Sequence, residues 1–218
     1  MSDPILERAA CRPSPIDPEG FNPAAKIPFG CTPEHIKKSM EEFQNWLQIV
    51  NEQMYARKLP RLETMLMPAN FSSIVGEFVV SSIPKYCATL VKNAYHNGHP
   101  DLIPTGMFDK NLCQHSSQGI EVKGSRYLKN WQGHNPEDTW LMVFVFTSNR
   151  PTDELKGKEP TPFKFRMVLG AELKKTDWLF AGRSKTSRRT ITASVTDTGL
   201  KKMIANWIYR DADIRASS

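Results

Sequence analysis

The nine-residue run Thr139–Thr147 is the feature that most constrains the fold of this chain. It reads Thr-Trp-Leu-Met-Val-Phe-Val-Phe-Thr, and a short apolar run rich in β-branched and aromatic residues is typical of a strand. Two other segments with strand character flank it, Ile120–Gly124 before it and Phe163–Gly170 after it. A further strand is expected over Arg189–Val195, where polar and apolar residues alternate.

Helices are expected both before and after these strands along the chain. Thr32-Pro33-Glu34 has the order of a hydroxyl cap, a first-turn proline and a first-turn acid, which predicts a helix that ends near Arg57. Its apolar residues recur every three or four positions, and this stripe can pack against the core or form a dimer face. A second helix is expected from Asn70 toward Ile83, and a third over Lys201–Arg210.

Length and composition favour one soluble domain. A chain of 218 residues with 39% hydrophobic and 24% charged residues can bury a sizeable core. Residues 1–33 contain seven prolines and predict an extended arm, mobile or wrapped around a partner, ahead of a single domain over 34–218. The predicted fold class is α/β, with a mixed central β-sheet flanked by helices.

The chain lacks an apolar run long enough to span a membrane, and its first residues lack a signal-peptide core, so we expect a cytoplasmic protein. The four cysteines are too far apart for paired Cys-x-x-Cys knuckles, and the five histidines are scattered. Reduced, structural thiols are therefore expected.

Two acids and a lysine lie in strand-like settings near the middle of the chain. Asp101 follows Pro100, and Glu121-Val122-Lys123 comes twenty residues later. On a strand, side chains two apart share a face, so Glu121 and Lys123 would point one way and Val122 the other. Carboxylates are hard oxygen ligands suited to Mg²⁺, and a bound metal ion assists hydrolysis of phosphodiesters.

The Pro100-Asp101…Glu121-Val122-Lys123 pattern resembles the PD-(D/E)xK nuclease superfamily, to which most type II restriction endonucleases belong. The resemblance implies a restriction endonuclease-like core and places Asp101, Glu121 and Val122 at a Mg²⁺ site, with Lys123 positioning the attacking water. Many members also carry a Glu on a helix before the Asp strand, and Glu77 fits that place. The resemblance covers a motif and not the whole chain.

Context selects this copy of the motif, because Glu-x-Lys occurs three times. The copy at 154–156 lies in a charged segment bounded by prolines and predicts a solvated loop. The copy at 172–174 follows a credible strand but has no Pro-Asp shortly before it. Surface acids on an ordinary strand beside a chance Pro-Asp turn remain the alternative for 121–123.

Positive charge is concentrated toward the C-terminal end. The net charge is +6, and residues 151–218 carry the whole excess, with fourteen Lys and Arg against eight Asp and Glu. The densest cluster is expected to contact phosphates or bases and comprises Arg183, Lys185, Arg188 and Arg189. Arg126 and Gln132, just after the Glu-x-Lys strand, are further candidates for DNA contact. Trp131, between them, is expected to be a core residue.

Together these features predict a Mg²⁺-dependent endonuclease that cuts double-stranded DNA at a short specific sequence, a type II restriction enzyme acting as a homodimer. In this hypothesis Asp101, Glu121, Lys123 and Glu77 form the catalytic group, with no small-molecule cofactor and no membrane partner. Two alternatives stay open. One is a structure-specific repair or resolvase nuclease of the same superfamily. The other is a DNA-binding module without catalytic activity.

Overall fold

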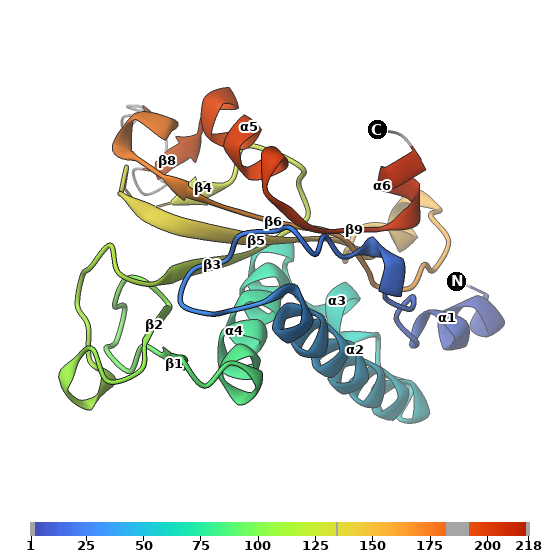
Figure 1. Cartoon of the computed structure of the whole chain (residues 1–218). Helices are drawn as coiled ribbons and strands as arrows, with labels where there is room; N and C mark the ends of the chain where they lie inside the picture. The colour runs from blue at the N-terminus through green and yellow to red at the C-terminus, as the bar shows by residue number, and fades with distance from the viewer. Residues whose placement is uncertain (1–2, 134, 182–191, 217–218) are drawn as a thin grey trace.

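The structure is a computed structural model that describes residues 3–133, 135–181 and 192–216. A six-stranded mixed sheet forms its centre, a small three-stranded sheet lies beside it, and helices pack against both faces (Figure 1). The prediction of a mixed central sheet flanked by helices is confirmed. No helix in the described part of the chain is long and apolar enough to cross a membrane.

The helices are α1 (Pro4–Ala10), α2 (Pro33–Ala56), α3 (Leu62–Met65), α4 (Pro68–Tyr86), α5 (Asp197–Ala205) and α6 (Ala212–Ala216). The strands are β1 (Leu90–Lys92), β2 (Leu102–Pro104), β3 (Ile120–Ser125), β4 (Gln132–Gly133), β5 (Thr139–Thr147), β6 (Lys164–Leu173), β7 (Trp178–Ala181), β8 (Thr192–Val195) and β9 (Trp207–Arg210). Short 3-10 turns are η1 (Pro18–Gly20), η2 (Asp109–Asn111), η3 (Glu154–Lys156) and η4 (Lys175–Asp177).

The large sheet has the strand order β1-β2-β3-β5-β6-β9. Among the described strands, β3 and β5 are the one parallel pair, with Ile120 opposite Trp140 and Ser125 opposite Val145. The neighbouring pairs are antiparallel. Strand β5 is at the centre and is buried along nearly its whole length, which explains its continuous apolar sequence.

Each face of the large sheet has its own apolar core. On one face α2 and α4 contribute Phe43, Phe71 and Val75, which pack with Phe144 and Phe165 of the sheet. On the other face Leu141 and Val143 pack beneath α5 and the three-stranded sheet β4-β8-β7. Figure 1 shows α2 and α4 below the sheet and α5 above it.

Helix α2 follows the sequence prediction closely. Thr32 is its N-cap, Pro33 occupies the first turn, and His35 completes a reciprocal capping pair with Thr32. The apolar stripe at Ile36, Met40, Phe43 and Leu47 is fully buried in the core. Of the two roles left open for this stripe, core packing is the one observed.

Helix α4 begins two residues earlier than predicted. The expected start at Asn70 is wrong, because Met67 is the N-cap, without a side-chain hydrogen bond, and Pro68 opens the helix. Proline suits the first helical position since its missing N–H would be unpaired there anyway. The helix then continues to Tyr86, with Pro84 in its last turn.

The helix expected over Lys201–Arg210 is wrong in its second half. Helix α5 ends at Ala205, and Trp207–Arg210 forms strand β9 on β6. Asn206 fixes the change of direction, because its side-chain amide donates to the carbonyls of Gly170 (2.7 Å) and Lys26 (2.9 Å). Long-range pairing overrides the helical spacing of the apolar residues.

Residues before α2 are bound to the domain. Helix α1 occupies a stretch expected to be extended, and the chain then runs beside the edge of the sheet (Figure 1). Phe21 bridges to Tyr209 of β9, and the backbone N–H of Asn22 donates to the carbonyl of Ile208 at 3.0 Å. This segment therefore wraps its own domain.

Candidate active site

Asp101 is held at an open part of the edge of β3. Strand β2 pairs with β3 at Leu102↔Ile120, so the β3 backbone beyond Ile120 has no strand partner on that side. The Asp101 carboxylate takes the partner's place, since its Oδ2 accepts the Val122 backbone N–H at 2.8 Å. The N–H and C=O of one strand residue point to the same side of the strand, so the Val122 carbonyl also faces this open edge.

Glu121 and Lys123 lie on the same face of β3, as the alternation predicts. The Lys123 Nζ is 3.0 Å from the Glu121 Oε1, whereas the Val122 side chain is buried in the core under α4. Close packing of β3 on α4 depends on Gly124, where an added Cβ would lie 2.4 Å from the Ser72 carbonyl oxygen. The strand therefore has little freedom to shift, and the acid and lysine positions are fixed with it.

Two residues that sequence reasoning missed complete this cluster. The His99 Nδ1 is 3.0 Å from the Glu121 Oε2, and the His99 Nε2 is 3.1 Å from the Glu137 Oε2. His99 directly precedes Pro100-Asp101, so its place beside the motif was a signal in the sequence. Glu137 lies just before β5, and the parallel β3–β5 pairing brings it level with the start of β3.

The two central acids have opposite pKa shifts. Burial and the nearby Glu121 charge raise the pKa of Asp101 to about 7. Burial also acts to raise the pKa of Glu121, but the hydrogen bond from His99 and the Lys123 charge outweigh it and lower that pKa to about 2. Glu121 is therefore ionised at neutral pH, whereas Asp101 keeps its proton to a higher pH than an ordinary aspartate.

The pKa values of Lys123 and His99, the two basic residues of this cluster, are both raised. Burial acts to lower the pKa of Lys123, and the carboxylates around it, Glu121 foremost, raise it on balance. His99 behaves in the same way, with burial opposed by Glu121, Glu137 and Asp101. Lys123 is thus a persistent positive charge beside Glu121, suited to attract a phosphate.

Asp101, Glu121 and Lys123 line two hollows, each of about 370 Å³. One opens toward the three-stranded sheet and is also lined by His99 and Glu137. The other opens toward α4 and is also lined by Ser72, Ser73, Gly76 and Glu77. We call these three residues and the space on both sides of them the acidic hollow.

Glu77 lies on α4 at the rim of the acidic hollow. Its side chain is 68% exposed and forms an ion pair with Lys92 at 2.8 Å. Its charge acts to raise the pKa of Asp101, so the two carboxylates face a common space. The predicted supporting role of Glu77 remains a prediction.

The residues expected to contact DNA have different surroundings. The Arg126 guanidinium lies over the rings of Phe71 and Phe146 and donates to the Ser148 carbonyl at 2.8 Å. Burial and the charge of Arg150 lower its pKa to about 10. The side chain therefore packs within the fold, and a DNA contact would require it to leave these partners.

Gln132 is exposed on β4, next to Gly133 of the acidic hollow's wall, where a nucleic acid could reach it. Trp131 beside it is 3% exposed, which confirms it as a core residue. The basic cluster Arg183, Lys185, Arg188 and Arg189 lies outside the described residues.

The other two Glu-x-Lys copies lack these surroundings. Residues 154–156 form the exposed turn η3, as the proline-bounded segment indicates. Glu172 and Lys174 form an exposed pair at 2.5 Å at the end of β6. Of the three copies, the one at 121–123 has its glutamate and lysine partly buried beside Asp101, whereas the glutamates and lysines of the other two are exposed.

Asp101 and Glu121 both line the acidic hollow. Their carboxylate oxygens are of the ligand type that Mg²⁺ takes, alongside waters and phosphate oxygens. Burial first, and then the Glu121 charge, raise the pKa of Asp101, so the ionised form of this carboxyl would gain from a cation placed beside it.

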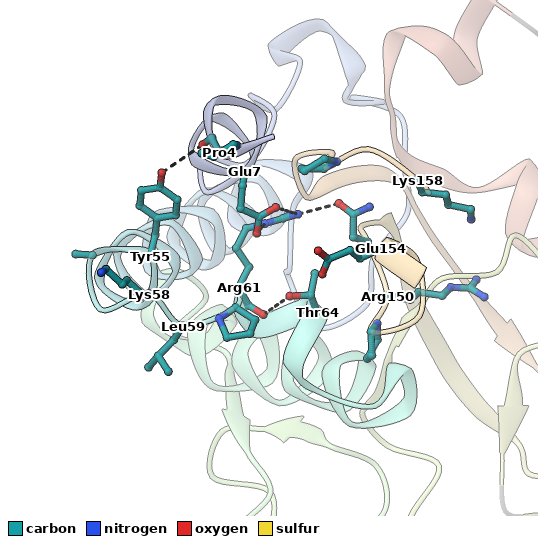
Figure 2. Close-up of a pocket in the computed structure, with 15 residues that line it drawn as sticks. Pro4, Glu7, Tyr55, Lys58, Leu59, Arg61, Thr64, Arg150, Glu154 and Lys158 are labelled. Atoms are coloured by element: carbon teal, nitrogen blue, oxygen red, sulfur yellow. Dashed lines mark hydrogen bonds and ion pairs between the residues drawn. The ribbon is translucent and has the colours of Figure 1, made fainter. Parts of the chain in front are cut away.

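A cavity of about 860 Å³, larger than either half of the acidic hollow, lies elsewhere (Figure 2). It is bounded by α1, the end of α2, α3 and the segment after β5, and Arg61 lies within it. Arg61 bonds Glu7 at 2.9 Å and Asn149 at 2.9 Å, so its charge is already satisfied by the protein. The acidic hollow is the better candidate for chemistry.

Comparison with protein-family models, with curated proteins and with solved structures returns no significant match to this chain. The candidate site therefore depends on its own geometry and on the motif resemblance.

Proposed function

We propose that the protein is a Mg²⁺-dependent nuclease that hydrolyses phosphodiester bonds of double-stranded DNA, with its active site in the acidic hollow. The observation that carries the proposal is the grouping of Asp101, Glu121 and Lys123 at the open edge of β3. The central sheet, with helices on both faces, is compatible with the restriction endonuclease-like core that the motif resemblance implies.

Each residue has a distinct role in this proposal. Asp101, Glu121 and the Val122 carbonyl would hold Mg²⁺, which lowers the pKa of a bound water and offsets charge on the phosphate. Lys123 keeps its proton because carboxylates surround it, so it orients the attacking water and stabilises negative charge on the phosphate. Glu77 at the rim supports the cation site electrostatically.

His99 contacts one carboxylate oxygen of Glu121, and Lys123 contacts the other. Its two ring nitrogens face Glu121 and Glu137, so the imidazole bridges the start of β3 and the segment before β5. We assign it a positioning role, since a carboxylate held on two sides keeps one orientation toward a cation.

Recognition of a specific sequence by a homodimer is the further part of the proposal. The exposed Gln132 and the basic cluster at 183–189 are the candidates for DNA contact. The apolar stripe of α2 is used in the core, so a dimer would have to pair through another surface.

A cleavage assay tests the activity and its site together. Purified protein is incubated with mixed-sequence linear DNA and with a branched junction, with Mg²⁺ or with EDTA. We expect discrete fragments of linear DNA with Mg²⁺ alone, and a loss of at least about 100-fold in Lys123→Ala, in line with removal of one charge-stabilising group.

Lys174→Ala is the matched control, because it removes a lysine from an exposed Glu-x-Lys pair on the same sheet. Its cleavage rate should equal that of the wild type. Cutting of the junction alone would identify a structure-specific nuclease. DNA binding without cleavage, unchanged by EDTA or Lys123→Ala, would favour the binding module and refute the proposal.

A further inference from the structure

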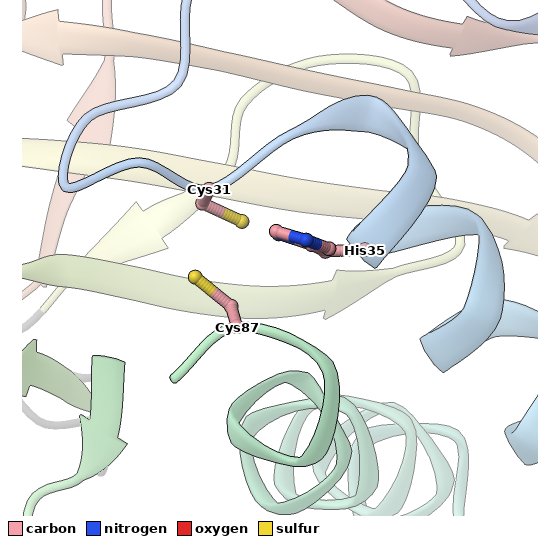
Figure 3. A group of neighbouring side chains, drawn as sticks. All are labelled: Cys31, His35 and Cys87. Atoms are coloured by element: carbon pink, nitrogen blue, oxygen red, sulfur yellow. The ribbon is translucent and has the colours of Figure 1, made fainter. Parts of the chain in front are cut away.

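A second group of ligand-type side chains lies away from the acidic hollow. Cys31 precedes α2, His35 is in the first turn of α2, and Cys87 follows α4 (Figure 3). One ligand atom from each of these residues lies within 4.8 Å of the others. Four and fifty-two positions separate them along the chain, and so their proximity was not evident from the sequence.

The two thiols are enclosed by the protein. Cys31 is 5% exposed and Cys87 is 2% exposed, while His35 is partly buried. Burial and the neighbouring Cys87 raise the pKa of the Cys31 thiol. Cys31 therefore holds its proton firmly without a cation, and a metal ion that binds it as a thiolate would displace that proton.

The surroundings of the thiols favour negative charge once it forms. Both lie beside the first turn of α2, a helix of 24 residues, whose N-terminal end carries partial positive charge. The Thr32 backbone N–H acts to lower the pKa of Cys31. Two thiolates at this place would thus be stabilised by the helix end as well as by a metal.

His35 can supply a nitrogen without changing its tautomer. Its Nδ1 accepts the Thr32 backbone N–H at 3.3 Å, which in the neutral ring leaves the proton on Nε2. The Nδ1 lone pair therefore accepts only this long hydrogen bond, and a metal ion could bind Nδ1 in place of the Thr32 N–H. Figure 3 shows the ring directed toward the space between the two sulfur atoms.

We propose that Cys31, His35 and Cys87 bind a thiolate-preferring divalent cation, Zn²⁺, with solvent as the fourth ligand. Tetrahedral zinc with metal–sulfur bonds of roughly 2.3 Å places sulfur atoms roughly 3.8 Å apart, so the ligands need to approach by no more than about 1 Å. Mg²⁺ takes oxygen ligands and would not compete here. The site would connect the start of α2 to the end of α4.

A cobalt titration of the full-length, reduced protein tests this site. Co²⁺ bound by thiolates gives charge-transfer absorption that oxygen ligands do not give. We expect one Co²⁺ per chain, displaced by one Zn²⁺, and loss of the absorption in Cys31→Ser and in Cys87→Ser. His35→Gln should weaken binding at least about tenfold, since even indirect support of a metal ligand has this effect.

Cys11→Ser and Cys113→Ser are matched controls, because both remove a buried free thiol outside the group. They should leave the absorption and stoichiometry unchanged. Circular dichroism of each variant shows whether it is folded. Wild-type protein without thiolate absorption, or a Cys31–Cys87 disulfide in place of metal binding, would overturn the proposal, as would retained absorption in either cysteine variant.

Discussion

Two clusters of buried charge lie near the two ends of β5, and they are balanced in different ways. At one end Arg61 is 1% exposed and contacts Glu63, which is fully buried, and Glu7. At the other end the partly buried Glu121 contacts Lys123 and His99, His99 also contacts Glu137, and Asp101 lines the same hollow. Both clusters join segments far apart in the sequence, so either could be structural.

The difference lies in how well each cluster satisfies its own charges. Burial acts to lower the pKa of Arg61, but its bond to Glu7 and the charge of Glu63 raise that pKa on balance. In the acidic hollow the pKa of Asp101 moves to about 7, against ionisation. A carboxyl in a hollow whose ionised form is disfavoured by its surroundings is a candidate for a functional site.

The largest stability effect is expected at the balanced cluster. Arg61→Met should lower the free energy of unfolding by about 3 to 5 kcal/mol, because it leaves the buried Glu63 without its cation. Urea unfolding measures the change, and Arg61→Met combined with Glu63→Gln should recover part of it. A loss below about 1 kcal/mol would remove the contrast between the two clusters.

At the acidic hollow, a substitution is expected to raise the free energy of unfolding instead of lowering it. A carboxyl with a raised folded pKa costs stability as pH rises from its ordinary value of about 4 to about 7. Asp101→Asn should therefore stabilise the metal-free protein at pH 8, by about 1 to 3 kcal/mol after discounting for relaxation.

The same variant has an internal control. At pH 5 the folded wild type already carries a protonated Asp101, so most of the difference should disappear. Added Mg²⁺ should stabilise the wild type and not Asp101→Asn. Unfolding curves at both pH values, with and without Mg²⁺, measure this, and a destabilised variant at pH 8 would contradict the assignment.

The smallest effect on stability and on cleavage is expected at Glu77, on the rim of the acidic hollow. Glu77→Gln removes an exposed ion pair with Lys92, and such pairs contribute about 0 to 1 kcal/mol. Cleavage should change by less than about tenfold, which is 1.4 kcal/mol, if Glu77 acts only through its charge. Initial rates over a range of Mg²⁺ concentrations measure this, and a much larger loss would make Glu77 a direct ligand.

Local signals predicted much of this fold. The apolar run Thr139–Thr147 is β5 with the same bounds, and the cap at Thr32 starts α2. The strand character of Trp207–Arg210 was missed because apolar spacing alone cannot show that β6 offers an edge for pairing. Helices and strands that are determined by contacts within a few residues were predictable. Those that depend on pairing with a distant segment were not.

The same division applies to the candidate site. Glu121 and Lys123 are two residues apart, so alternation alone predicts that they meet. Glu137 joins them through the parallel pairing of β3 with β5, which no local pattern specifies. The group of Cys31, His35 and Cys87 depends on how α2 packs against α4, and it too lies beyond the reach of sequence spacing.

The N-terminal segment beside β9 also bears on how copies of this protein avoid one another in solution. Unpaired backbone along a sheet edge is a template on which another chain can add a strand and begin an aggregate. The bridge from Phe21 to Tyr209 and the bond from Asn22 to Ile208 occupy part of that edge, and β1 at the opposite edge is only three residues long. In the described part of the chain, neither terminal strand of the large sheet, β1 or β9, thus offers a long free template, and we expect the proline-rich start of the chain to reduce aggregation through β9.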